Sequence, residues 1–300
     1  MLQIGIFTGY FPYEVKEVVR RIRQHGFNTV QLDLDFRDGD FSTDALTPSL
    51  ARAVAGEFRK NDLPICCISG YCNLVHPDKE TRGVLIERLK RIIALARDFG
   101  SPYVISETGT FNQESDWAPH PKNKTEEGYE ICRDIIADLA ETARAYGATF
   151  LLETYVNNVI GSVQETLRLF ADIDSPALGL LMDPTNYFED HNIGDIDGEL
   201  NRIFNALDDK IRIAHAKDVK WSADTSEKHA DIDAVESHTF RGVGHIELPA
   251  PGLGDLNYPL YLERLARKHP NIPLIIEHLE EADVPRAKQF ISEVLSEVGC

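Results

Sequence analysis

Short apolar runs alternate with longer amphipathic segments along the whole chain. Each run is rich in Ile, Val, Leu or Phe, and the segment after it has apolar residues at spacings of three and four, which is typical of a helix with one buried face. Several of these segments end at a glycine, as at Gly26, Gly100 and Gly147, where a left-handed residue commonly stops a helix. The pattern predicts eight strands near residues 3–8, 29–34, 64–69, 102–107, 149–154, 178–183, 211–216 and 273–278.

This strand–helix alternation indicates an α/β protein with a parallel sheet, because the strands are too apolar to leave one face in water. Eight repeats favour closure into a (β/α)8 TIM barrel, which needs ~250 residues. The 300-residue chain is therefore expected to form a single TIM-barrel domain over residues 1–300. An open doubly wound sheet is the alternative, but the first turn, FTGYFPYE, lacks the GxGxxG pattern of dinucleotide-binding folds.

Two connections are longer than the ~2 to 6 residues that such units need. One is the polar segment 106–128, and the other runs from 219 to 257 and contains Trp221, Arg241 and three histidines, His229, His238 and His245. Both follow the carboxyl end of a strand, so we expect them to overhang the face of the barrel that carries active sites.

Composition narrows the range of partners. The 49 acidic and 31 basic residues give a formal charge of −18, which repels nucleic acids and anionic membranes at long range. No apolar stretch approaches the ~18 residues of a membrane span, and the N-terminus shows no basic leader. We expect a cytoplasmic protein with no nucleic-acid or membrane partner. The five cysteines lack paired metal-finger spacing, and we interpret them as free thiols.

Four predicted strands end in side chains that can bind a metal: Glu153, Asp183, His215 and Glu277. One polar residue at a strand end is more often a turn former or a solvated rim residue. Four at matched depth on four strands converge on one mouth of the barrel and predict a site for one divalent metal ion. Three carboxylates and one imidazole suit Mn²⁺, Mg²⁺ or Co²⁺, with Zn²⁺ possible, better than a structural zinc site rich in thiolates.

Several motifs surround these residues: ETGTF (107–111), LLET (151–154), MDPTN (182–186), HAKD (215–218), PGLGDLNY (251–258) and LIIEHLE (274–280). With them the chain resembles the xylose isomerase-like TIM barrel superfamily, in the group called sugar phosphate isomerases/epimerases. That group includes ketose 3-epimerases, inosose isomerases and dehydratases, and endonuclease IV. The resemblance implies that Glu153, Asp183, His215 and Glu277 bind the metal and that Glu153 and Glu277 also shuttle protons. The resemblance is also compatible with a homo-oligomer, but it does not predict the number of subunits.

The chain also departs from the family. Many relatives have His three residues after the Asp of the sixth strand, where this chain has Asn186. A trinuclear zinc site like that of endonuclease IV needs several further histidines and an Asp-x-His pair before the glycine turn, and GVGHIELPAPGLG supplies no such pair. A nuclease is therefore disfavoured.

Further residues are candidate substrate contacts, each with a structural alternative. Glu107 is a contact or a solvated strand end; Lys217 binds a substrate hydroxyl or pairs with Asp218; His76 lines the mouth or starts the next helix. Asn186 and Arg241 complete the set.

The chemistry expected from this site is proton transfer on a sugar or ketosugar. A metal held beside the substrate carbonyl would stabilise an enediolate, and two glutamates would act as acid and base. This describes a metal-dependent isomerase or epimerase. A dehydratase or lyase acting on an inosose or keto-sugar is the alternative, and a non-catalytic binding module is a third hypothesis. Because few cations accompany the carboxylates, a neutral small-molecule sugar is favoured over a phosphorylated one.

Overall fold

The computed structural model describes residues 2–223 and 239–299, and the side chains of residues 239–241 also lie outside the description. In this part of the chain, eight parallel strands close into a barrel in the order β1-β11-β7-β6-β5-β4-β3-β2. The closed ring confirms the predicted (β/α)8 barrel and excludes the open sheet. The barrel strands are β1 (Gln3–Phe7), β2 (Thr29–Leu32), β3 (Ile65–Ser69), β4 (Tyr103–Glu107), β5 (Thr149–Glu153), β6 (Leu178–Met182), β7 (Ile211–Ala216) and β11 (Pro273–Ile276).

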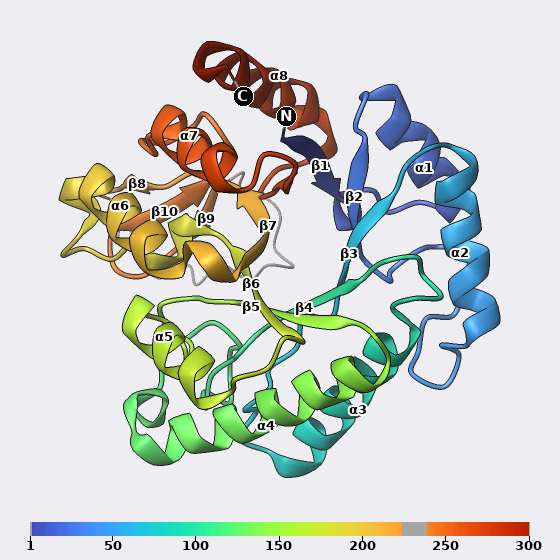
Figure 1. Cartoon of the computed structure of the whole chain (residues 1–300), viewed down its shortest axis with the longest axis horizontal. Coiled ribbons are helices and arrows are strands. Elements are labelled where there is room, and N and C mark those ends of the chain that lie inside the picture. Colours follow the sequence, from blue (N-terminus) through green and yellow to red (C-terminus); the bar gives the residue numbers. More distant parts are fainter. Residues whose placement is uncertain (1, 224–238, 300) are drawn as a thin grey trace.

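Helices surround the strands on the outside of the barrel (Figure 1). Local sequence sets where they begin. Asp78 accepts a hydrogen bond from the Thr81 amide at the start of α3 (Lys79–Leu95). Ser162 and Glu165 form a capping box at the start of α5 (Val163–Asp172). None of the helices in the described ranges is long and apolar enough to span a bilayer. They are α1 (Val15–Gln24), α2 (Pro48–Lys60), α3 (Lys79–Leu95), α4 (Glu126–Ala145), α5 (Val163–Asp172), α6 (Ile196–Leu207), α7 (Tyr258–Lys268) and α8 (Val284–Val298).

The inside of the barrel is filled with side chains. One apolar layer takes a fully buried residue from each of six strands: Cys67, Ile105, Leu151, Leu181, Ile213 and Ile275. A second and larger core packs the outer face of the strands against the helices. Because strand side chains alternate between the two faces, the residue two positions after each member of the inner layer points into the barrel again, one level nearer the mouth.

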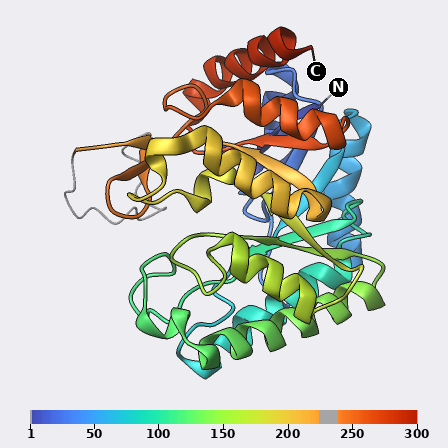
Figure 2. The same ribbon diagram turned by 60° about the vertical axis from the view of Figure 1, so that its left-hand side comes forward.

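The long connection after β7 contains a small sheet that the sequence did not predict. Its order is β8-β10-β9, with β8 at Lys220–Trp221, β9 at Thr239–Arg241 and β10 at Ile246–Pro249. Figure 2 shows this sheet projecting from the barrel beside α6. Asp190, in the loop after β6, accepts hydrogen bonds from the backbone and the ring of His245 and so joins that loop to the sheet.

Asp218 organises the return from this sheet to α7. Its buried carboxylate accepts hydrogen bonds at 2.9 Å from the amides of Val219, Gly252 and Leu256. A Cβ on Gly254 would lie 2.5 Å from Asp218 Oδ1, so the loop passes too close to this carboxylate for a larger residue. The amides of the glycine-rich turn thus bind an anion supplied by the protein itself.

Asp218→Ala should therefore destabilise the fold. It leaves buried N–H groups without an acceptor, and we expect a loss of about 3 kcal/mol in the free energy of unfolding, measured by urea denaturation. Asp255→Ala removes an exposed carboxylate from the same turn and should change stability by less than about 0.5 kcal/mol. Equal, small losses in both variants would contradict the anchoring role of Asp218.

Candidate metal centre and active site

The candidate site occupies the level of the barrel directly above the apolar layer. Glu153, Asp183, His215 and Glu277 each stand two residues after a member of that layer, namely Leu151, Leu181, Ile213 and Ile275. Glu153 and His215 are in β5 and β7, whereas Asp183 and Glu277 directly follow β6 and β11, and these four strands are neighbours in the ring. The alternation of strand side chains therefore brings together residues that lie up to 124 positions apart in the sequence, from 153 to 277.

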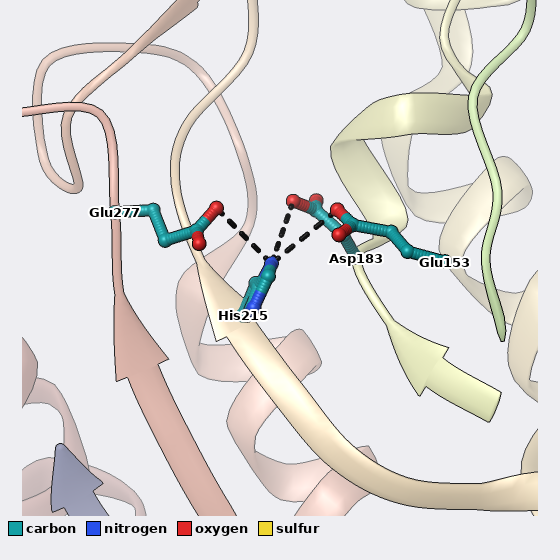
Figure 3. A group of neighbouring side chains, drawn as sticks. All are labelled: Glu153, Asp183, His215 and Glu277. Atoms are coloured by element: carbon teal, nitrogen blue, oxygen red, sulfur yellow. Dashed lines mark ion pairs between the residues drawn. The ribbon is translucent and has the colours of Figure 1, made fainter. Parts of the chain in front are cut away.

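These four side chains form a quartet in which they point toward one another (Figure 3). One ligand-type atom from each lies within 4.8 Å of the others. His215 Nδ1 is central, at 3.1 Å from Glu277 Oε2, 3.3 Å from Glu153 Oε1 and 3.8 Å from Asp183 Oδ2. All four residues are buried, and Nδ1 has no aligned hydrogen-bond partner among the described residues. This donor set could hold one divalent cation, which would satisfy the orphaned nitrogen and neutralise the carboxylates.

The pKa shifts of His215 and Asp183 agree with a site that attracts positive charge. Burial by itself would lower the pKa of His215, but the carboxylates of Glu277 and Glu153 outweigh it and raise that pKa well above its usual value. Burial likewise opposes ionisation of Asp183, yet Lys217 and His215 hold its pKa below the usual range. The protonated ring of His215 and the ammonium group of Lys217 therefore supply positive charge where a metal ion would otherwise supply it.

Lys217 is the ammonium in question. Its Nζ lies 2.9 Å from Asp183 Oδ2, and the side chain is 5% exposed. Asp183 Oδ1 accepts from the Thr185 amide and hydroxyl. Lys217 thus pairs with Asp183, whereas the alternative from the sequence was Asp218, whose carboxylate binds backbone amides instead.

Both oxygens of Glu153 have hydrogen-bond donors. The Tyr71 hydroxyl donates to Oε2 at 2.5 Å, and Asn186 Nδ2 donates to Oε1 at 2.9 Å. Asn186, where many relatives have His, is 2% exposed and contacts a member of the quartet directly. The amide at position 186 therefore holds one oxygen of Glu153.

Glu107 lies beside Glu153, since the two are paired in register across β4 and β5. Burial and the charge of Glu153 raise the pKa of Glu107 to about 8, against a hydrogen bond from Asn158 Nδ2 that favours the ionised form. Glu107 can therefore exist as a neutral acid near pH 7 and donate a proton.

A pocket of about 760 Å³ opens above these residues. Seven acidic residues line it together with the aromatic side chains of Phe7, Tyr10, Tyr71 and Trp117. Lys217 is the single Lys or Arg among the described residues of its lining. The acidic residues are Asp33, Asp35, Glu107, Asp116, Glu153, Glu277 and Glu280.

Of the other candidate contacts, His76 lies outside the pocket lining and the side chain of Arg241 is not described. His76 is half-buried and accepts a hydrogen bond from the Asp78 amide through Nδ1, in the approach to α3, and it is not part of the pocket lining. Arg241 is in β9, but its side chain lies outside the described part of the structure, as do His229 and His238.

Other residues of the site had no signal in the sequence analysis. Gln31 on β2 is fully buried and contacts His215, although 184 positions separate them. Tyr71 reaches Glu153 from the loop after β3. Tyr258 and Tyr261, one helical turn apart on α7, donate to the backbone carbonyls of Lys217 and His215 and fix the end of β7. The only signal for these residues in the sequence is that they are polar side chains, Gln or Tyr, in strands, loops or a helix near the mouth of the barrel.

Comparisons with known proteins agree with this architecture. Residues 19–294 match the model of the family described as xylose isomerase-like TIM barrel. Among solved structures, a D-tagatose 3-epimerase-like protein superposes with a TM-score of 0.70 at 17% identity, covering 99% of this chain and 98% of its own. A search of curated proteins gave no match.

Two further structures have the same fold. The probable 3-DHS dehydratase of petrobactin synthesis from Bacillus anthracis gives a TM-score of 0.69 at 14% identity, with 97% and 98% of the two chains covered. A xylose isomerase-like TIM barrel protein from Mycobacterium smegmatis, solved in complex with magnesium, gives 0.68 at 17% identity, with 100% and 97% covered. The chain belongs to the xylose isomerase-like TIM barrel family.

The quartet should bind about one divalent ion per chain. Protein purified without chelator and then titrated with Mn²⁺ should show this stoichiometry by elemental analysis, and Mn²⁺ at 100 times Kd should stabilise the fold by about 2.7 kcal/mol. His215→Ala should lose stoichiometric binding, while His245→Ala, which alters a histidine outside the quartet, should keep it. Binding by the His215 variant equal to that of the wild type would refute the assignment.

Glu107 should make the metal-free protein less stable as the pH rises from about 4.5 to about 8. In that window the folded state holds a proton that the unfolded chain, with the usual carboxyl pKa of 4.5, has released. Glu107→Gln removes this linkage, so its Tm should exceed that of the wild type by a few degrees at pH 8.5 and by little at pH 4.5. Glu114→Gln, at an exposed position in the same loop, serves as the control. A constant difference at both pH values would show that the Glu107 carboxyl does not titrate in this window.

Proposed function

We propose that this protein is a metal-dependent isomerase or epimerase of a sugar or ketosugar, with Glu153 and Glu277 as the proton-transfer groups. One observation carries the proposal: of the four candidate metal ligands, Glu153 and Glu277 also line the pocket, whereas Asp183 and His215 are not among its described lining residues. Two glutamates therefore face both the candidate metal position and the space for a substrate.

The two glutamates approach from opposite sides of His215 (Figure 3). A substrate carbon placed between them can lose a proton to one carboxylate and regain a proton from the other, which inverts a centre or moves a carbonyl. A divalent ion held by Glu153, Asp183, His215 and Glu277 would supply positive charge where negative charge develops on the substrate oxygen. Lys217, paired with Asp183, keeps a further positive charge at the same position.

A neutral substrate suits this pocket better than a phosphorylated one. Seven acidic residues line it against one lysine, whose ammonium is already paired, so an additional dianion would meet net repulsion. The glycine-rich turn gives no phosphate cradle, because Asp218 occupies its amides. Aromatic walls such as Tyr10 and Trp117 fit the apolar faces of a sugar ring.

The test is proton exchange in D₂O with Mn²⁺-loaded enzyme and a panel of ketohexoses, inososes, 3-keto-sugars and one ketose phosphate. We expect an isomeric product that carries deuterium at the carbon beside the carbonyl, seen by NMR, from a neutral member of the panel. Glu153→Gln and Glu277→Gln should each slow this step by ~10² or more if metal binding is retained.

The same experiment separates the alternatives. Loss of water, seen as an unsaturated carbonyl product that absorbs in the ultraviolet, would replace the proposal with a dehydratase. Near-normal rates in both glutamine variants with metal bound would show that the two glutamates are ligands only. Absence of any reaction across the panel would favour a binding module.

A further inference from the structure

Gln31 contacts the candidate metal centre from β2, a strand that is not adjacent to any of the strands carrying the four candidate ligands. It stands on β2, two residues after Thr29, and its side chain is 0% exposed. Strand β2 is not a neighbour of β7 in the ring, so the side chain must cross the barrel interior to reach His215. A buried amide in that position requires an explanation, because an unsatisfied polar group there would destabilise the barrel.

Each polar atom of this amide has a partner. Oε1 lies 2.8 Å from His215 Nε2 and 3.7 Å from the Cys67 thiol, which donates to it. Nε2 donates to Ser69 Oγ at 3.2 Å and lies 3.4 Å from Glu277 Oε1. The reverse orientation would turn the amide oxygen toward the Glu277 carboxylate, which can only accept while ionised. The contact with Glu277 therefore fixes the amide with its carbonyl facing the histidine.

That carbonyl determines which nitrogen of His215 carries the proton. A carbonyl oxygen only accepts, so His215 Nε2 must be the N–H donor at this contact. When the ring is neutral, the lone pair is then on Nδ1, the nitrogen that lies 3.1 Å from Glu277 Oε2 and 3.3 Å from Glu153 Oε1. Gln31 thus presents the correct atom of His215 to the centre of the quartet.

We infer that Gln31 is a positioning residue for the metal site: its amide holds His215 in the Nε2–H tautomer and leaves Nδ1 free to bind the ion. The inference rests on the metal site of the proposed function. A neutral amide performs this role without adding a fourth negative charge beside Glu153, Asp183 and Glu277. Partners of this kind typically change metal affinity by ~10- to 100-fold.

The experiment uses Zn²⁺, which is diamagnetic, and the full chain. Gln31→Met keeps the length of the side chain but removes the acceptor, and it should raise the Kd for Zn²⁺ by ~10- to 100-fold in competition with a chromogenic chelator. Thr29→Val is the matched control: it removes a buried hydroxyl from the same strand, which bonds to the Pro64 carbonyl and not to the quartet. Its Kd should stay within about twofold of the wild type while its Tm falls, which separates general destabilisation from loss of positioning.

A second measurement does not depend on any variant. Long-range ¹H–¹⁵N correlation spectra of Zn²⁺-loaded wild type, labelled at histidine nitrogen, should show the His215 proton on Nε2 and none on Nδ1. A proton on Nδ1, or Gln31→Met binding Zn²⁺ as tightly as the wild type, would overturn this inference and leave the proposed function standing. Failure of the wild type itself to bind Zn²⁺ or Mn²⁺ would overturn both.

Discussion

Repulsion among three buried carboxylates is the constraint on which this site depends. Glu153, Asp183 and Glu277 place oxygens within 4.8 Å of His215 Nδ1 and of one another, and like charges ~4 Å apart repel by about 4 kcal/mol even at an effective dielectric constant of 20. The fold tolerates them because positive charge is built in: Lys217 pairs with Asp183, and the pKa of His215 is raised. A divalent ion would replace the proton on Nδ1 as the compensating charge. The need to compensate three negative charges therefore governs both the stability of the site and its capacity to bind a cation.

The barrel resists this repulsion because the layer beneath the site is closely packed. Ile213 and Ile275 are fully buried and stand two residues before His215 and Glu277, so moving a ligand would mean moving its strand against the core. Tyr258 and Tyr261 add hydrogen bonds to the carbonyls of Lys217 and His215. Side chains held in this way need little reorganisation when an ion or a substrate arrives, which is the condition for effective electrostatic stabilisation.

Sequence patterns predicted the eight barrel strands and the clustering of Glu153, Asp183, His215 and Glu277 at the mouth, because both follow from strand periodicity. The partners of these residues were less accessible. Gln31 and Tyr71 contact His215 and Glu153 across 184 and 82 positions, and no spacing rule links residues from strands that are not adjacent in the barrel. The pairing of Lys217 with Asp183 depends on side-chain direction, which the neighbouring letters HAKD do not reveal. The β8-β10-β9 sheet was missed because its strands have two to four residues, too short for a periodic signal.

The two glutamates of the quartet differ in the hydrogen bonds that they receive from surrounding residues. Glu153 receives hydrogen bonds from Tyr71 and Asn186, one at each oxygen, while Glu277 receives the more distant amide of Gln31 at 3.4 Å. Donors that stabilise a carboxylate favour its ionised form, and the hydrogen bonds from Tyr71 and Asn186 do so for Glu153. The Tyr71 hydroxyl, in turn, places a donor beside Glu153 at the pocket wall. The same fold occurs in an epimerase-like protein and in a probable dehydratase, so the barrel alone does not determine the reaction, and side chains beside the two glutamates, such as Tyr71 and Asn186, are positions at which the chemistry of such barrels can differ.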